Sequence, residues 1–385
     1  MAEWKTCTLS DLGEIVGGAT PSTKDESNYG GTIAWITPKD LSVLKGRYIK
    51  YGERNITEKG LCSCSAQMMP ANSILFSSRA PIGYVAIAAG PVCTNQGFKS
   101  IIPNAQTDYM FLYYLLKYKK NAIEAMGSGT TFKEVSGSTM RGIEVTVPVD
   151  KAEQERISSV LAAIDEKIEN NNRINDNLQQ QAMALYASMF LDNPALETIA
   201  GTLKDIADVT MGQSPSGSSY NEDSNGEVFY QGRAEFGYRF PTRRLFTTEP
   251  KRMAEAGDVL LSVRAPVGDL NVAYERCCIG RGLGAIHGRN GYQSFVLYTM
   301  FALRPQLDVY NGEGTVFGSI NRNALNDMPI DIPSEDAIAA FEAVVRPMDD
   351  MIRINYEENC RLQELRDSLL PRLMSGEVNV SNIDI

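Results

Sequence analysis

Ser77–Pro81 reads S-S-R-A-P and continues I-G-Y-V-A, and Ser262–Pro266 reads S-V-R-A-P and continues V-G-D-L-N. The two stretches lie 185 positions apart in the chain. The same offset aligns three later features: Gly129-Thr130 with Gly314-Thr315, Phe132 with Phe317, and Pro148 with Pro333. One local match would be chance, but several matches in one register indicate an internal duplication. We therefore expect this chain of 385 residues to hold two copies of one domain.

The composition is that of an ordinary globular protein, with 43% apolar and 22% charged residues. The first residues lack the apolar segment of a signal peptide, and no run of about 18 apolar residues occurs, so we expect a cytoplasmic protein without a membrane span. Seven cysteines, an odd number without any C-x-x-C pair, favour reduced thiols. His287 is the single histidine, which excludes a histidine-rich metal site. We expect neither a metal nor a cofactor.

Short apolar segments bounded by Pro and Gly recur at matching places and predict strands joined by tight turns. They are Ser73–Phe76 and Tyr84–Ala88 in the first copy, and Asp258–Leu261 and Leu270–Ala273 in the second. Each copy also has an apolar and aromatic run without helix breakers, which predicts a helix over Met110–Tyr118 and over Ser294–Leu303. A strand-like run, Ile143–Val147 or Met328–Ile332, ends each copy. The expected fold class is a mixed, strand-rich α/β domain that occurs twice.

Each copy is followed by a long stretch whose apolar positions step by four and three residues, the pattern of a heptad seam. The seam of the first stretch is Ile157, Leu161, Ile164, Ile168, Asn171, Asn175 and Leu178. The seam of the second is Phe341, Val345, Met348, Ile352, Asn355, Asn359 and Leu362. Because a helix with so narrow an apolar stripe is unstable alone, the two helices are expected to pair. They would form an antiparallel coiled coil in which the asparagines set the register.

These patterns divide the chain into five segments. The expected boundaries are 1–150 for the first globular copy, 151–193 for the first long helix, 194–335 for the second copy, 336–376 for the second helix and 377–385 for a tail. The net charge of −10 argues at first against a nucleic-acid partner. However, residues 151–193 carry 7 acidic and 4 basic side chains and residues 336–385 carry 10 and 5, whereas residues 1–150 carry 13 and 15. Most of the negative charge is therefore on the helices.

Five motifs within this architecture resemble the specificity subunit of type I DNA restriction-modification systems, over essentially the whole chain. They are S-S-R-A-P-I-G from Ser77, T-N-Q-G-F-K from Thr94, G-T-T-F-K-E from Gly129, I-D-E-K-I-E-N-N-N-R-I-N from Ile164 and L-R-D-S-L-L-P-R-L-M-S-G-E-V from Leu365. The resemblance implies that 1–150 and 194–335 are target recognition domains, each reading one half of a split DNA sequence, and that the paired helices space them. It also implies that the helices dock two methyltransferase subunits, which methylate adenine with S-adenosylmethionine, and that restriction subunits can join the complex.

The residues agree that this chain carries no catalytic site. An adenine methyltransferase holds the flipped base with an N/D-P-P-Y/F loop, and the nearest match, Asn193–Leu196, lacks the second proline and the aromatic residue. No G-x-x-x-x-G-K-[ST] phosphate loop occurs. The glycine cluster Gly280–Gly284 has the wrong spacing, and we interpret it as a turn.

The two S-x-R-A-P turns should present Arg79 and Arg264 at a domain edge. Arginine suits contacts to phosphate and to guanine, although each arginine could instead make a structural pair within its turn. Copies that read different sequences should share backbone contacts and differ in base contacts. Because the motif occurs in both copies, phosphate positioning fits these arginines better than base reading.

Further DNA contacts are expected in two basic strips, 39–59 and 231–252, which hold six Lys or Arg each, although solvated loops are the alternative. Thr130, Thr131 and Lys133 in the first copy and Thr315 in the second lie in glycine-rich loops, whose backbone N–H groups could approach a phosphate. A hairpin turn is the alternative for these loops. Gln96 and Gln231 could read adenine through paired amide bonds, although surface solvation is the favoured explanation for any single glutamine. The predicted DNA contacts are Lys39, Arg47, Arg79, Gln96, Thr130, Thr131, Lys133, Gln231, Arg233, Arg243, Arg244, Arg264 and Thr315.

Two other interpretations stay open from the sequence. Within the same resemblance, the chain could be the reader of a system in which one polypeptide combines methyltransferase and nuclease. In a different class, a duplicated protein- or carbohydrate-binding module could be held on a coiled-coil scaffold.

Overall fold

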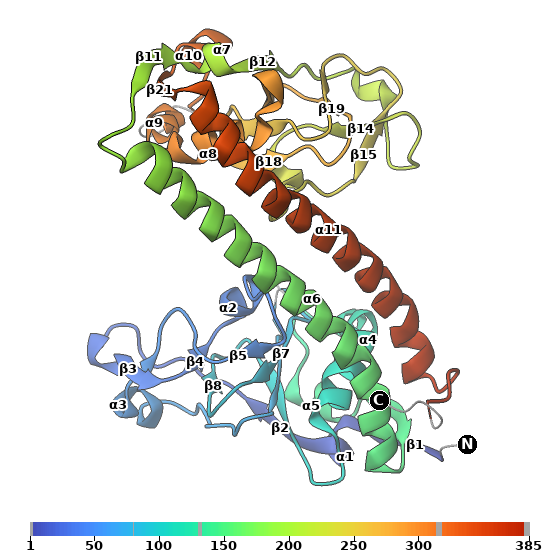
Figure 1. The fold of residues 1–385 in the computed structure, drawn as a ribbon. Coiled ribbons are helices and arrows are strands. Elements are labelled where there is room, and N and C mark those ends of the chain that lie inside the picture. The colour runs from blue at the N-terminus through green and yellow to red at the C-terminus, as the bar shows by residue number, and fades with distance from the viewer. Residues whose placement is uncertain (1–2, 80, 130–132, 313–317, 381–385) are drawn as a thin grey trace. The chain divides into compact units, whose positions relative to one another are not determined.

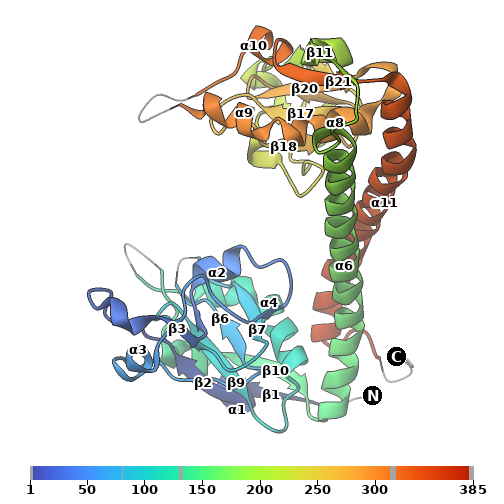
Figure 2. The same cartoon turned by 60° about the vertical axis from the view of Figure 1, so that its left-hand side comes forward.

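The computed structural model describes residues 3–79, 81–129, 133–312 and 318–380. The chain divides into two compact units: unit 1 comprises residues 1–173 and 356–385, and unit 2 comprises residues 174–355. The division passes through both long helices, so each unit contains one globular part and a portion of each helix (Figure 1 and Figure 2). The five segments expected from the sequence are separated where the residue pattern changes, so each long helix is a segment of its own. The two units are separated by contacts within the chain, so each of them includes parts of both helices.

The globular part of unit 1 is built on a five-stranded sheet with the order β2-β9-β6-β7-β5. Its strands are β2 (Gly13–Gly17), β5 (Tyr48–Ile49), β6 (Ile74–Phe76), β7 (Val85–Ala88) and β9 (Lys99–Pro103). Two further pairs are β1 (Trp4–Thr8) with β10 (Glu144–Pro148), and β4 (Trp35–Ile36) with β8 (Cys93–Thr94). The remaining elements are β3 (Tyr29–Ile33) and the short helices α1 (Leu9–Leu12), α2 (Pro38–Ser42), α3 (Glu58–Cys62) and α5 (Gly137–Arg141).

Helix α4 (Tyr109–Ala125) covers the centre of this sheet and supplies much of the core, including Phe111, Leu112 and Leu115. It begins where Asp108 accepts the backbone N–H of Phe111 at 2.7 Å, an N-cap that satisfies one of the first free amides of the helix. The same carboxylate accepts the hydroxyl of Ser158 at 2.8 Å. The start of α4 is therefore fixed to the first long helix.

The globular part of unit 2 has two larger sheets, with the orders β12-β20-β17-β18 and β13-β15-β14-β19-β16. Their strands are β12 (Ala207–Met211), β13 (Tyr220–Asn221), β14 (Glu227–Tyr230), β15 (Leu245–Thr247), β16 (Met253–Ala254), β17 (Val259–Ser262), β18 (Leu270–Val272), β19 (Cys277–Ile279) and β20 (Leu283–Gly288). A separate pair joins β11 (Thr198–Thr202) to β21 (Pro329–Pro333). The helices are α7 (Leu203–Ile206), α8 (Gln293–Ala302), α9 (Arg304–Asp308) and α10 (Arg322–Asn326).

The mixed, strand-rich α/β fold expected from the sequence is confirmed, with element boundaries shifted by a few residues. The predicted helices over Met110–Tyr118 and Ser294–Leu303 are α4 and α8, and the predicted final strands are β10 and β21. In both units the first strand pairs antiparallel with the last, as Trp4 with Pro148 and as Thr198 with Pro333. Each first strand ends in a capping box, formed by Thr8 with Asp11 and by Thr202 with Asp205.

The two long helices are α6 (Lys151–Tyr186), which ends in a π-helical turn over Ala187–Leu191, and α11 (Glu335–Met374). They contact each other within each unit. In unit 1, Asp165 pairs with Arg366 at 2.9 Å and Asn171 donates to Asn359 at 2.9 Å, so the segments run antiparallel there. In unit 2, Asn355 donates to Asn175 at 2.8 Å.

Most of the expected seam residues are covered: Ile157, Leu161, Ile168, Asn171, Asn175, Val345, Ile352, Asn355 and Asn359 are buried, and Ile164, Leu178, Met348 and Leu362 are partly buried. Ile157 and Leu161 belong to the core of unit 1, and Phe341 and Val345 belong to the core of unit 2. The buried asparagines are each bonded to another side chain, which offsets the cost of removing them from water. Among the described residues, no helix is long and apolar enough to cross a bilayer.

Candidate nucleic-acid interface

The S-x-R-A-P turn of unit 1 is built by its serine, proline and glycine. The Ser77 hydroxyl donates to the Pro81 carbonyl at 2.8 Å and accepts the Tyr84 backbone N–H at 2.8 Å. Gly83 has a φ of 93°, a conformation that side chains with a Cβ rarely adopt, and its N–H donates to the Ser77 carbonyl. Ser77 is fully buried. The serine therefore closes the turn, and the arginine is left outside it.

Unit 2 repeats this turn bond for bond. The Ser262 hydroxyl donates to the Pro266 carbonyl at 2.8 Å and accepts the Asp269 N–H at 2.9 Å. Gly268 has a φ of 100° and donates to the Ser262 carbonyl. The repeated letters S, P and G thus have a structural cause, whereas the repeated arginine has none in the turn itself.

The two arginines have different electrostatic environments. Arg79 forms a β-bridge with Glu134, and its Nε and Nη2 both lie 2.8 Å from Glu134 Oε2. Arg264 forms the corresponding bridge with Ser319, which has no charge. Among the described residues, the Arg264 side chain makes no ion pair. Both arginines are exposed, but only Arg79 is held by a carboxylate.

A second turn lies directly beside each arginine. In unit 1 the Gly97 carbonyl accepts the Ser78 N–H at 2.7 Å, and in unit 2 the Gly282 carbonyl accepts the Val263 N–H at 2.9 Å. A Cβ on Gly97 would lie 3.1 Å from Cγ of Pro38, and a Cβ on Gly282 would lie 3.1 Å from Cα of Gly232. Because of these close approaches, Lys39, which follows Pro38, lies beside the second turn of unit 1. Arg233, which follows Gly232, lies beside the second turn of unit 2.

Each unit therefore brings three exposed polar side chains to one place, which we call its corner. The corner of unit 1 consists of Lys39, Arg79 and Gln96, and the corner of unit 2 consists of Arg233, Arg264 and Arg281. Lys133 is exposed one residue before Glu134, the partner of Arg79. The corners contain five of the ten predicted contacts that the structure describes, and the residues of each corner come from three separate segments of the unit.

The corner cations are partly paired. Lys39 lies 2.6 Å from Glu53, and Arg233 pairs with Asp269. Partial burial tends to raise the pKa of Asp269, but hydrogen bonds from Arg233 and Arg304 outweigh it and lower that pKa. The carboxylate is therefore charged at neutral pH. Gln231 is exposed close by, where its carbonyl accepts the Gly282 N–H.

Arg243 and Arg244 lie in another place, around a cleft of about 440 Å³ that Arg276 also lines. Each of the three arginines has an acidic partner: Arg243 pairs with Glu275, Arg244 with Glu235 and Arg276 with Glu227. This surface is exposed and rich in arginine, but its positive charge is largely neutralised within the protein.

Arg47 requires a correction, because it is not a surface cation. Its side chain is only 9% exposed, its Nε donates to Glu169 Oε1 at 2.9 Å and its Nη2 donates to Glu169 Oε2 at 3.1 Å. Burial tends to lower the pKa of Arg47, but the bonds to Glu169 on α6 outweigh it and raise that pKa. Arg47 fixes the globular part of unit 1 to α6, and we no longer include it among the DNA contacts.

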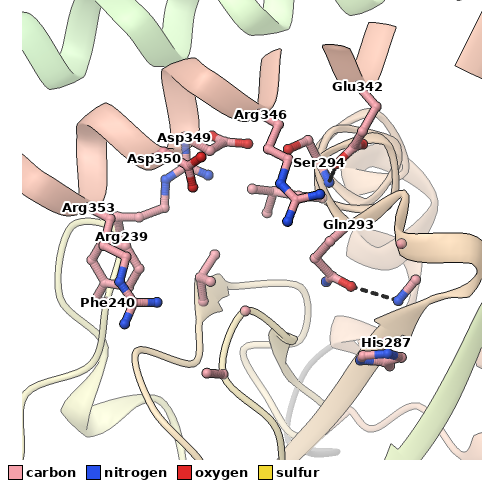
Figure 3. A pocket seen from close by; sticks show the side chains of 16 residues that line it. Arg239, Phe240, His287, Gln293, Ser294, Glu342, Arg346, Asp349, Asp350 and Arg353 are labelled. Carbon is pink, nitrogen blue, oxygen red and sulfur yellow. Dashed lines mark hydrogen bonds and ion pairs between the residues drawn. The ribbon is translucent and has the colours of Figure 1, made fainter. Parts of the chain in front are cut away.

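Arg239 holds the matching place in unit 2, at the edge of a pocket of about 330 Å³ between the globular part and α11 (Figure 3). Its Nη2 donates to Asp349 Oδ1 at 3.0 Å and to the Tyr298 hydroxyl at 3.1 Å. Among the described residues, its Nε and Nη1 have no hydrogen-bond partner. Burial raises the pKa of Asp349 and of Glu342, which also line this pocket.

Three predicted DNA contacts cannot be placed, and the single histidine has a carboxylate partner. Thr130, Thr131 and Thr315 lie outside the described residues. The Nδ1–H of His287 donates to Asp258 Oδ1 at 2.6 Å, and the described residues contain no group of His, Cys, Asp and Glu side chains that could hold a metal ion.

Arg281 is the corner residue that sequence reasoning missed. The sequence predicts a turn over Gly280–Gly284, which is correct for the backbone, but the side chain of Arg281 is exposed at the corner. The signal was present, because the offset of 185 residues aligns Arg281 with Gln96.

Comparison with known proteins gives a consistent result. Residues 1–180 match the family described as type I restriction modification DNA specificity domain. The chain is 29% identical to the type I restriction enzyme MjaIX specificity subunit of Methanocaldococcus jannaschii, over 99% of this chain and 95% of that protein. It is 28% identical to the EcoR124I/EcoR124II specificity subunit of Escherichia coli, over 51% of this chain and 50% of that protein. The crystal structure of a type I restriction-modification S subunit from M. genitalium shares the fold, with a TM-score of 0.59 and 17% identity over 97% and 96% of the two chains.

Proposed function

Because this chain belongs to the specificity subunits of type I restriction-modification systems, we propose that its two globular parts each read one half of a bipartite DNA site. In this proposal the globular parts are copies of one target recognition domain, α6 and α11 form the antiparallel coiled coil that spaces them, and two adenine methyltransferase subunits dock on the assembly. The chain itself performs no chemistry.

The observation that carries the proposal is the repeated corner. The same backbone bonds, Ser78 to Gly97 and Val263 to Gly282, hold the same turns, and two of the three equivalent places carry a cation in both units. Phosphate contacts position a protein on DNA without reading its sequence, so they can be the same in two readers of different sequences. Lys39 with Arg233 and Arg79 with Arg264 fit this role.

The spacer role is supported by the bonds between the two helices. Asn171 with Asn359 in unit 1 and Asn175 with Asn355 in unit 2 are specific polar pairs inside an otherwise apolar seam. Buried asparagine pairs favour one register over its neighbours at some cost in stability. A fixed register fixes the offset of the two helices along each other, and the number of helical residues sets their length at about 1.5 Å per residue.

Docking of methyltransferase subunits is supported by the outer face of α11. Val344, Met351 and Ile354 are 49%, 45% and 54% exposed on this helix. The helical segments are also acidic, which disfavours contact with DNA and suits contact with a protein partner. The chain alone should bind DNA weakly, because its net charge of −10 opposes the phosphate backbone.

The test is a genome-wide map of methylated adenine in cells with and without this chain, with the methyltransferase present in both. We expect a bipartite methylated motif that disappears with the chain. An unchanged map would contradict the proposal and favour a protein- or carbohydrate-binding role.

The spacer is tested separately, by deleting one heptad from α6 and the facing heptad from α11. The half-sites should stay the same while the gap between them shortens. An unchanged gap would show that the helices do not set it.

A further inference from the structure

One position of the corner differs between the units in a way that matters for DNA reading. The residue before the corner glycine is Gln96 in unit 1 and Arg281 in unit 2. Their backbone environments match, since Gly97 and Gly282 accept equivalent N–H groups and Phe98 and Leu283 pair with the strand that carries the serine turn. The same framework therefore presents a different side chain in each unit.

The flanking positions keep their chemical character. Lys39 corresponds to Arg233 and Arg79 corresponds to Arg264, so each corner holds two cations besides the variable position. If these cations grip phosphates, the third side chain of the same corner is close enough to the nucleic acid to contact it. A position that differs between two such grips is where the sequence can be read.

Each side chain matches one base in the major groove. Glutamine pairs with adenine when its carbonyl oxygen accepts from N6 and its amide donates to N7, whereas arginine donates two bonds to O6 and N7 of guanine. The Thr20 hydroxyl donates to Gln96 Oε1, which orients the amide and leaves the second lone pair of Oε1 and both Nε2 hydrogens for other partners.

Arg281 is fixed through its backbone, because its N–H donates to Ser214 Oγ at 3.3 Å. Among the described residues its guanidinium makes no ion pair. Thr20 and Ser214 occupy matching places, each directly before a proline. Matching residues thus contact the position in both units, Thr20 at the side chain of Gln96 and Ser214 at the backbone of Arg281, and in unit 2 the guanidinium is available.

We infer that Gln96 and Arg281 are specificity-determining residues at one shared position, where Gln96 reads an A·T base pair in one half-site and Arg281 reads a G·C base pair in the other. This inference rests on the proposed function, because it requires that both corners face DNA.

The experiment is a reciprocal exchange in the complete methyltransferase complex, with methylated adenines mapped across the genome. Gln96→Arg should change one base pair of one half-site from A·T to G·C and leave the other half-site alone. Arg281→Gln should change one base pair of the other half-site from G·C to A·T. The new preference should be roughly tenfold to a hundredfold, the discrimination of one bidentate pair.

Gln106→Arg is the matched control, because Gln106 is also exposed in unit 1 but follows β9, whereas Gln96 precedes it. It should leave the motif unchanged. If both exchanged variants methylate the wild-type motif, the inference is wrong while the proposed function stands. If the wild-type chain directs no bipartite motif at all, the proposed function itself fails.

Discussion

Each unit fixes its globular part to the long helix that follows it, α6 in unit 1 and α11 in unit 2. The residue types that make this junction are the same, but the junction of unit 2 has fewer hydrogen bonds. In unit 1 the Tyr114 hydroxyl donates to Asp165 at 2.7 Å, and in unit 2 the Tyr298 hydroxyl donates to Asp349 at 3.0 Å. The carbonyls of Arg47 and Arg239 accept equivalent strand amides, from Ile87 and Val272, each at 2.8 Å. The framework is common to both, down to single bonds.

The difference lies one helical turn further along. In unit 1, Glu169 follows Asp165 by four positions and holds Arg47 with both carboxylate oxygens. In unit 2, the residue that follows Asp349 by four positions is Arg353. Arg239 therefore lacks a second carboxylate, and its Nε and Nη1 have no partner among the described residues. A buried polar group without a partner costs free energy, so the junction of unit 2 is the weaker one. The turns and the hydrogen-bonded backbone are therefore common to the two units, while the charges around them vary.

The largest effect is expected from Glu169→Ala. It leaves the buried Arg47 guanidinium without its carboxylate, and it should lower the free energy of unfolding of unit 1 by about 2–4 kcal/mol, somewhat below the range for fully buried pairs because Glu169 is 27% exposed. Urea unfolding of the full chain measures this. Glu166→Ala, an exposed change on the same helix, is the control and should cost little. Equal losses in both variants would contradict the role given to Arg47.

The second prediction makes unit 2 resemble unit 1. Arg353→Glu places a carboxylate where Glu169 stands, and the new bonds to Arg239 should raise the free energy of unfolding of unit 2 by about 1–2 kcal/mol. The gain is reduced by loss of the cation–π contact in which Arg353 lies 4.6 Å from the Tyr274 ring centre. Arg353→Gln loses that contact without adding the charge. If Glu and Gln give the same stability, Arg239 does not need the second carboxylate.

The third prediction concerns the two corner arginines. Their substitution should change the free energy of DNA binding by about 1 kcal/mol. Arg264→Ala should weaken binding of the complex more than Arg79→Ala, because Arg79 must leave Glu134 to grip a phosphate. Glu134→Gln should then strengthen binding and raise its salt dependence. Binding isotherms at several salt concentrations check both changes, and the methylated motif should stay the same in all three variants. A changed motif would make these arginines base readers.

Much of the fold could be predicted because it rests on local patterns. The glycine and proline spacing located the turns at Arg79 and Arg264, and the seven-residue period located the seams through Asn171 and Asn355. Long-range partners could not be predicted. Nothing near Arg47 in the sequence distinguishes it from a surface cation, since its partner Glu169 is 122 residues away. Arg281 was hidden for a related reason: the glycines beside it suggested only a turn.

We propose above all that the two globular parts are equivalent readers on one framework. Replacing residues 194–335 by residues 1–150 tests this directly, with methylated adenines mapped in cells that carry the chimeric chain and the methyltransferase. The account predicts a methylated inverted repeat of the unit 1 half-site, with the unit 2 half-site lost. A motif that keeps the unit 2 half-site would contradict it.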